Sequence, residues 1–184
     1  MFYRSERLFL RPPFPEDARA VYEGICDAGI VSMLASASWP YRVEHAEELC
    51  ARPFDARSPR FLITLPGEPG APVIGCIGLH AEQDGVEMGY WIARNRWGRG
   101  YAAEAGRAVL EIAGAVGHRK VVAGHYIDNQ ASGRVLRKIG FRETGEIRPA
   151  FCRARGGEVV LSRRYAVDLD TADGEVDNEQ VRAA

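Results

Sequence analysis

The sequence predicts a single mixed α/β domain organised around one sheet. The chain has 184 residues, of which 46% are hydrophobic, and this is enough for one substantial core. Some segments have the composition and period of a strand, and others repeat apolar residues with the period of a helix. Their order is strand, helix, helix, three strands, helix, strand, helix and two strands, which is typical of a mixed α/β domain.

The first half of the chain begins with a short strand and two helices. Two prolines end the strand, and Pro15 followed by Glu16 and Asp17 supplies the proline and the acids that favour a first helical turn. A segment rich in Pro and Gly at 66–70 separates the next two strands. The expected elements are a strand at 8–12, a helix from Pro15, a loop at 35–42, a helix at 44–51, and strands at 60–65 and 73–79.

The second half alternates strands with longer helices. Gln83-Asp84-Gly85 predicts a hairpin turn, because Asp-Gly readily adopts positive φ. Apolar residues repeat at helical spacing after residue 100, and Gly140 is placed to end the following helix. The expected elements are a strand at 86–92, a helix at 100–116, a strand at 120–124, a helix at 129–139, and strands at 141–147 and 158–167.

Acidic residues are concentrated at the C-terminal end. Residues 168–184 contain six acids and one base, with almost no large apolar residue, so this tail is expected to be disordered. The domain is therefore expected to span residues 1–167, where 23 basic and 19 acidic residues leave a net charge of +4. Such a surplus suits an anionic ligand and is too diffuse to indicate nucleic acid.

Several classes of protein are excluded by what the sequence lacks. No apolar run approaches the roughly 20 residues that cross a membrane, and no secretory signal is recognisable. The four cysteines are too scattered for a disulfide framework or a zinc site. A cytoplasmic protein with reduced thiols is expected.

A glycine-rich segment joins a predicted strand to a predicted helix. After the strand at 86–92, Gly98 and Gly100 precede the helix, and small residues let a ligand approach the main chain. The first N–H groups of a helix are unpaired and partly positive, so they bind phosphates. With Arg99 adding a full charge, the segment predicts a site for a diphosphate.

Two other interpretations of this segment are open. The glycines can simply permit a turn between strand and helix. Alternatively, residues 98–103 fit the G-x-G-x-x-A dinucleotide fingerprint, which requires an acid about 20 residues later and further βα units. Residues 117–125 contain no acid, and only one more βα unit follows, so the dinucleotide interpretation is disfavoured.

Four segments match, in order over residues 7–167, the motifs of one known family. They are R-L-F-L-R-P at 7–12 with E-D-A at 16–18, E-M-G-Y-W-I at 87–92, G-Y-A at 100–102, and N-Q-A-S at 129–132 with K-I-G-F at 138–141. They resemble the GCN5-related N-acetyltransferases (GNAT), and most closely the branch of ribosomal-protein N-terminal acetyltransferases (RimJ/RimL type). Trp97 departs from the pattern, because the family motif has Gln or Arg there.

The resemblance implies a fold and a reaction. The fold is a mixed, mostly antiparallel sheet with a splayed parallel strand pair and helices on both faces. The reaction is direct attack of a primary amine, either a protein α-amine or a small molecule, on acetyl-CoA, without a metal. The residues implied to hold acetyl-CoA are Gly98, Arg99, Gly100, Tyr101, Ala102 and Ala103 at the diphosphate, and Tyr90, Trp91, Ile92 and Asn129 along the pantetheine arm.

Candidate catalytic residues follow from the chemistry of the transfer. Strand alternation places Glu87 beside the missing side chain of Gly89, so Glu87 is the candidate base; it is equally interpreted as a solvated or Arg-paired residue. Many relatives donate a proton to the thiolate from a Tyr where this chain has Leu136. Ser132 is the candidate donor instead, although a hydroxyl near a helix start often bonds to the backbone.

The acceptor site is less defined by the sequence. His80 and His125 are alternative bases, and structural histidines are more common. The loop containing Trp39 and Tyr41 is expected to line the acceptor pocket or to fill the core. An N-acetyltransferase, as monomer or homodimer, is the leading hypothesis, and a catalytically silent acyl-CoA-binding domain is the alternative.

Overall fold

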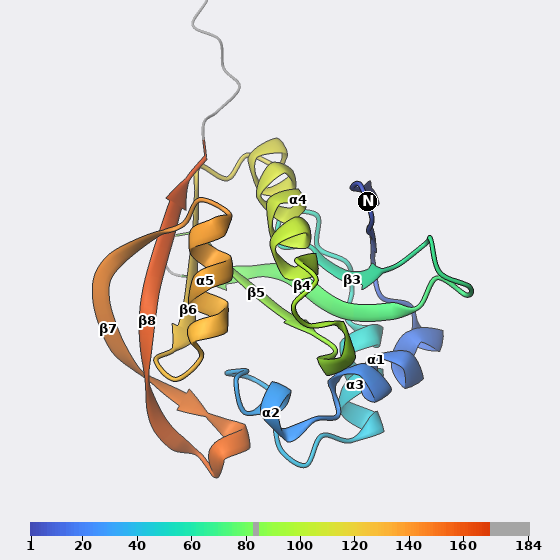
Figure 1. Ribbon diagram of the computed structural model, residues 1–184, viewed down its shortest axis with the longest axis horizontal. Helices are drawn as coiled ribbons and strands as arrows, with labels where there is room; N and C mark the ends of the chain where they lie inside the picture. The colour runs from blue at the N-terminus through green and yellow to red at the C-terminus, as the bar shows by residue number, and fades with distance from the viewer. Residues whose placement is uncertain (83–84, 170–184) are drawn as a thin grey trace, which may run out of the picture.

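The computed structural model describes residues 1–82 and 85–169. Gln83 and Asp84 of the expected hairpin turn, and the expected tail from residue 170 onward, lie outside these ranges. The described part forms one eight-stranded sheet in the order β1-β2-β3-β4-β5-β6-β8-β7 (Figure 1). The strands are β1 Tyr3–Arg4, β2 Phe9–Arg11, β3 Arg60–Thr64, β4 Val73–Glu82, β5 Gly85–Ile92, β6 Lys120–Tyr126, β7 Arg142–Cys152 and β8 Glu158–Asp168.

Helices cover both faces of this sheet, as predicted (Figure 1). They are α1 Ala18–Ile25, α2 Ala28–Val31, α3 Val43–Ala51, α4 Tyr101–Ala115 and α5 Gln130–Lys138, with 3-10 turns η1 Pro15–Asp17, η2 Arg94–Arg96 and η3 Arg153–Arg155. One apolar core lies between the sheet and the helices α4 and α5, and a second lies beneath α1, α2 and α3. Alternate side chains of a strand therefore enter different cores, one on each side of the sheet.

The strands β5 and β6 form the splayed parallel pair that the family resemblance implied. They pair only at Val86 with Val121 and at Glu87 with Val122, at the beginning of both strands. Beyond these residues β5 stays paired with β4, and β6 stays paired with β8. The facing edges of β5 and β6 therefore carry backbone groups that no strand partner satisfies along the sheet.

Three elements differ most from the expectations, while β4 and β6 each run two or three residues further than expected. The two-residue strand β1 and the four-residue helix α2 are too short to give a periodic signal. The helix α2 begins because the Asp27 carboxylate accepts hydrogen bonds from the N–H groups of Gly29 and Ile30. The strand β7 continues to Cys152 instead of ending near residue 147, because it is the edge strand, where Pro149 removes no required ladder bond.

The described residues contain no helix that is both long enough and apolar enough to cross a membrane. Within the same residues, no three His, Cys, Asp or Glu side chains gather as metal ligands. Cys50, Cys76 and Cys152 are buried and Cys26 is half-buried, and all four are free thiols.

Candidate functional site

The glycine-rich turn leaves the main-chain N–H groups at the start of α4 accessible. Gly98 and Gly100 have φ of +75° and +80°, a left-handed conformation that a side chain disfavours. Gly100 is the residue before the helix, and no side chain caps this terminus. The first bond back into the turn runs from Glu104 N–H to the Gly100 carbonyl at 3.1 Å. The N–H groups of Tyr101, Ala102 and Ala103 precede it and point out of the helix.

Trp97, which departs from the family motif, braces this turn. Its indole Nε1 donates to the Ile92 carbonyl at 2.6 Å, which ties the turn to the end of β5. The Arg94 guanidinium lies 4.7 Å from the centre of the indole ring and also binds Asp27 through two hydrogen bonds. Arg96 is bound in the same way by Glu68. The segment that leads into the turn, from Arg94 to Trp97, is therefore held by two ion pairs and the indole bond.

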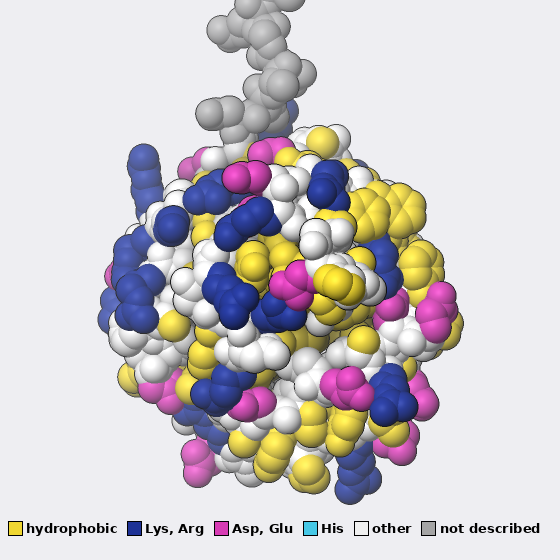
Figure 2. All heavy atoms as spheres, turned by 45° about the vertical axis from the view of Figure 1, so that its right-hand side comes forward, with side chains coloured by type: hydrophobic (Ala, Val, Ile, Leu, Met, Phe, Trp, Pro, Cys, Tyr) yellow, Lys and Arg dark blue, Asp and Glu magenta, His cyan; other side chains and the backbone are white. Residues whose placement is uncertain are grey.

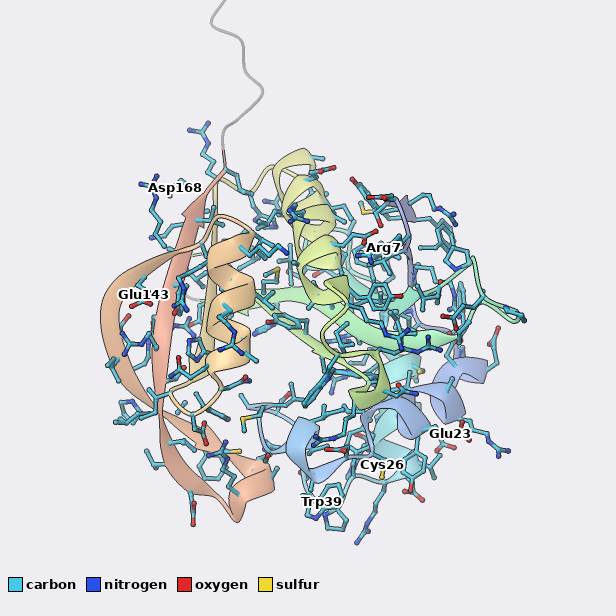
Figure 3. All side chains as sticks on the ribbon, in the orientation of Figure 1. Arg7, Glu23, Cys26, Trp39, Glu143 and Asp168 are labelled. Atoms are coloured by element: carbon cyan, nitrogen blue, oxygen red, sulfur yellow. The ribbon has the colours of Figure 1, made fainter. Side chains whose placement is uncertain are left out.

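The N-terminal segment also reaches the turn, which sequence reasoning missed. Arg7 forms an ion pair with Glu104 at 2.7 Å, and its Nη1 donates to the Arg99 carbonyl at 3.1 Å. Its guanidinium lies 4.8 Å from the centre of the Tyr101 ring (Figure 3). The Arg99 side chain is exposed, with no carboxylate within ion-pairing distance in the described ranges. Positive charge thus borders the free helix terminus.

Charge on this side of the molecule is otherwise mixed. Figure 2 shows Lys and Arg side chains spread over the face that comes forward, with Asp, Glu and hydrophobic side chains between them. No continuous basic surface of the kind that binds nucleic acid is visible on that face. The local positive character of the turn therefore comes from the helix terminus and from Arg99.

On the α4 and α5 side of the splayed strands, two hydroxyls meet. The Tyr90 hydroxyl lies 3.0 Å from Ser132 Oγ. Burial raises the pKa of Tyr90 to about 12 and keeps the phenol protonated. Asn129 caps α5 by accepting a hydrogen bond from the Ser132 N–H at 3.2 Å. The Ser132 hydroxyl therefore contacts another side chain rather than the backbone, and Leu136 is buried in the core below it.

On the opposite face, Glu87 is held by charged neighbours. The Arg164 guanidinium donates to Glu87 Oε1, and His80 Nε2 lies 3.4 Å from Oε2. Burial alone raises the pKa of this carboxyl, but the hydrogen bond from His80 and the charge of Arg164 outweigh it and hold the pKa below its usual range. Of the two structural interpretations, the Arg-paired one applies, and the solvated one does not.

Alternation along β5 divides the candidate residues as predicted. Val86, Met88 and Ile92 enter the core under α4, whereas Trp91 enters the core under α1 and packs against Gly24, where an added Cβ would lie 3.2 Å from the indole. Gly89 lies on the Glu87 face, where an added Cβ would meet the His80 ring at 3.4 Å.

The other predicted residues lie apart from one another. Trp39 is 44% exposed on its loop, whereas Tyr41 is 6% exposed within the core under α1 and α3, so of the two alternatives for this loop Tyr41 follows the core-filling one. His125 is buried, with Nδ1 at 2.7 Å from the Tyr126 carbonyl and Nε2 at 3.3 Å from the Tyr165 hydroxyl, so it is a structural histidine.

Two cavities open near these elements. One of about 470 Å³ lies between α1 and η2 and includes Gly24 and Arg94 in its wall. The other, of about 480 Å³, is lined by the loop after β2, the loop after α3, and His80 at the end of β4. Neither wall includes residues 98–103, and residues 97–100 of the turn are exposed.

Comparison with known proteins gives consistent results. Residues 7–142 match the model of the "Acetyltransferase (GNAT) domain" family. YoaA of Bacillus subtilis (strain 168), an uncharacterized N-acetyltransferase, is 36% identical over 80 residues, which span 41% of this chain and only 45% of YoaA. A GNAT-family acetyltransferase from Bacillus anthracis is 25% identical, with a TM-score of 0.79 over 91% of this chain and 98% of that one.

A further similar structure is RimL, a ribosomal L7/L12 alpha-N-protein acetyltransferase in complex with coenzyme A. It is 19% identical, with a TM-score of 0.73 over 93% of this chain and 99% of its own, which shows a shared fold. The family model, by contrast, covers most of the chain in sequence, including the turn and the start of α5. The chain therefore belongs to the GNAT family of acetyltransferases.

Proposed function

We propose that this enzyme transfers the acetyl group of acetyl-CoA to a primary amine. The observation that carries the proposal is the position of an uncapped helix terminus at the end of a strand pair that separates after two residue pairs. A single cofactor with a diphosphate and an extended amide-containing arm suits both features. The RimL structure, which holds coenzyme A, supports the proposal.

The diphosphate fits the residues of the turn. Main-chain N–H groups from Arg99 to Ala103, together with the positive end of α4, suit a doubly charged group, and Gly98 shapes the loop. The exposed Arg99 side chain adds a positive charge at the surface. Nothing lies within 4 Å of an added Cβ at Gly98, and at Gly100 the neighbouring group is the cationic Arg7 guanidinium, at 3.6 Å.

The arm of the cofactor fits the separated strands. Its amides have the hydrogen-bonding pattern of a short strand, and we assign them to the β5 edge around Tyr90, Trp91 and Ile92, which β6 leaves unpaired. The Ile92 carbonyl is not among the free groups, because it already accepts the Trp97 indole bond. We assign the Asn129 side chain to the same arm, through the amide nitrogen that its capping bond leaves available. When bound, acetyl-CoA supplies an activated thioester carbonyl for attack by the amine.

Glu87 is assigned to the acceptor amine. An ionised carboxylate on the face opposite the α4 core attracts an ammonium group and accepts a proton from it, directly or through water. Gly89 places no side chain beside it, and the His80 ring lies 3.4 Å from where a Cβ would stand. An α-amine, with an ordinary pKa near 8, demands less of this base than a lysine amine with a pKa near 10.4.

The departing thiolate is assigned to Ser132. Its hydroxyl lies on the α5 side of the separated strands. The Tyr90 hydroxyl, 3.0 Å away, can replace the proton that Ser132 gives to the thiolate. Leu136 cannot serve this role, since it carries no proton to donate. Trp39 is assigned to the acceptor pocket, since it is an exposed aromatic residue on a loop.

A protein α-amine is our preferred acceptor class, because the sequence motifs are most similar to those of ribosomal-protein acetyltransferases. We further infer a cytoplasmic monomer or homodimer that needs no metal. The domain is assigned to residues 1–167.

The proposal is tested by thiol release from acetyl-CoA across a panel of peptides, polyamines and amino sugars. Turnover with a peptide α-amine is the expected result. Acetyl-CoA binding by calorimetry without turnover on any amine would favour the silent binding domain. Absence of binding would overturn the cofactor assignment itself.

A further inference from the structure

Three charged or titratable side chains form a row across four strands, on the face of the sheet that carries Glu87. His80 on β4 is the direct cross-strand partner of Glu87 on β5. Arg164 on β8 is the cross-strand partner of Gly124 on β6 and reaches over that strand to Glu87. These are the titratable groups that contact Glu87 in the described ranges, while β6 contributes no charge between them. The row therefore runs unbroken from Arg164 to His80.

The row depends on a glycine. A Cβ at position 124 would lie 2.7 Å from Arg164 Nη1 and 3.4 Å from Glu87 Oε1. Any side chain there would push the guanidinium away from the carboxylate, and Gly124 has no positive φ that would otherwise require it. The sequence thus keeps a gap in β6 through which a cation on β8 reaches an anion on β5.

The three members differ in their access to water. The side chains of Arg164 and Glu87 are 10% and 19% exposed, whereas that of His80 is 54% exposed. His80 also lines the cavity of about 480 Å³ at the edge of the sheet. His80 therefore gives a proton held by Glu87 wider contact with water than Glu87 has itself, and the neighbouring cation opposes retention of that proton on Glu87.

We propose that this row is a proton exit, in which Arg164 positions Glu87 as a carboxylate and His80 carries the proton of the acceptor amine to solvent. The inference rests on the proposed acetyl transfer. One N–H bond of the acceptor ammonium breaks and the proton passes to Glu87 Oε2. The Nδ1–H tautomer of His80 accepts it at Nε2 and releases its Nδ1 proton to water, and exchange with solvent restores the starting tautomer. No electrons are transferred, and the amine is left neutral for attack.

The first test replaces His80. His80→Gln retains a hydrogen-bonding group toward Glu87 but cannot take up a proton, so kcat is expected to fall about 100-fold while the affinity for acetyl-CoA stays unchanged. In His80→Ala, added imidazole is expected to restore part of the lost rate in a saturable way. His118→Ala is the matched control, because His118 is half-buried away from Glu87 and, among the described residues, its ring bonds to the Arg57 carbonyl.

A wild-type kcat in His80→Gln would overturn the proposal. So would a His80→Ala variant that binds acetyl-CoA normally, has lost its rate and gains nothing from imidazole. Binding of acetyl-CoA by calorimetry reports that each variant is folded.

The second test replaces Arg164 and needs no turnover. The pKa of Glu87 is expected to rise in Arg164→Met, because burial then acts against fewer opposing charges, and to stay low in Arg164→Lys. The difference between the infrared carboxyl spectra of each protein and its Glu87→Gln counterpart isolates this group. An unchanged pKa in a folded Arg164→Met would overturn the role of Arg164. If wild-type protein acetylates no amine, the proposed function fails instead, whatever this titration gives.

Discussion

The turn before α4 and the charged row beside Glu87 use different chemical groups. The turn before α4 presents main-chain N–H groups whose direction is fixed by two glycines with positive φ and by the Trp97 brace. The row beside Glu87 presents side-chain charges that come from three strands and meet through the gap at Gly124. The turn is sensitive to substitutions that change the backbone conformation, and the row is sensitive to substitutions that change a charge. Different substitutions therefore test cofactor binding and turnover separately.

The largest expected effect is on the side-chain row. Glu87→Gln removes the carboxylate that we assign to the acceptor amine, and kcat is expected to fall about 1000-fold. The affinity for acetyl-CoA is expected to change far less, because the turn is untouched. Steady-state kinetics and calorimetry on the same preparation check both values. An unchanged rate at neutral pH would remove Glu87 from the mechanism.

The converse variant acts on the turn. Gly100→Val forces a β-branched residue to φ of +80°, a strain of about 1–3 kcal/mol that the loop relieves by moving its N–H groups. Acetyl-CoA affinity is expected to fall about 100-fold. Gly114→Ala is the control, because that helical glycine has open space around it and no positive φ. Tight binding by Gly100→Val would contradict the site assignment.

Stability is expected to depend on pH through Asp27. This side chain, at the start of α2, holds Arg94 before the turn. The Arg94 guanidinium and two backbone N–H groups lower the pKa of Asp27 to about 2. A lowered pKa stabilises the fold above the unfolded value near 3.9, and this contribution is lost as pH falls toward 2. Asp27→Asn retains the helix cap and is expected to flatten the loss of unfolding free energy between these values.

Urea unfolding of the wild type and of Asp27→Asn, at pH 5 and at pH 3, measures this difference. Equal slopes against pH in both proteins would show that the Asp27 and Arg94 pair contributes nothing.

The smallest expected effect concerns Trp97. Trp97→Phe keeps a ring beneath Arg94 but removes the indole hydrogen bond to the Ile92 carbonyl, which is expected to cost about 1 kcal/mol of stability. Acetyl-CoA affinity is expected to weaken by about fivefold or less, since the glycines still set the turn. Unchanged thermal unfolding in this variant would show that Trp97 is not a brace.

Local chemistry accounts for the parts that were predicted. The Pro-initiated helix, the α3 and α4 helices, and the turn with its glycines follow from residues that are close in sequence, and their periodicity is independent of the rest of the fold. The alternation that separates Glu87 from Met88 follows from strand geometry alone. The short elements β1 and α2 escaped prediction because they are held by contacts and caps rather than by a repeating pattern.

The sequence by itself determined the family, the strand, turn and helix that offer main-chain N–H groups, and the position of Glu87 on the same strand face as Gly89. Only the tertiary structure decided which side chains contact Glu87. Arg164 is 77 residues away along the chain and reaches Glu87 by crossing a strand at Gly124. The same holds for Tyr90 with Ser132 and for Arg7 with Glu104. Backbone sites are specified by neighbours in sequence, whereas side-chain sites are assembled by sheet order, which no local pattern contains.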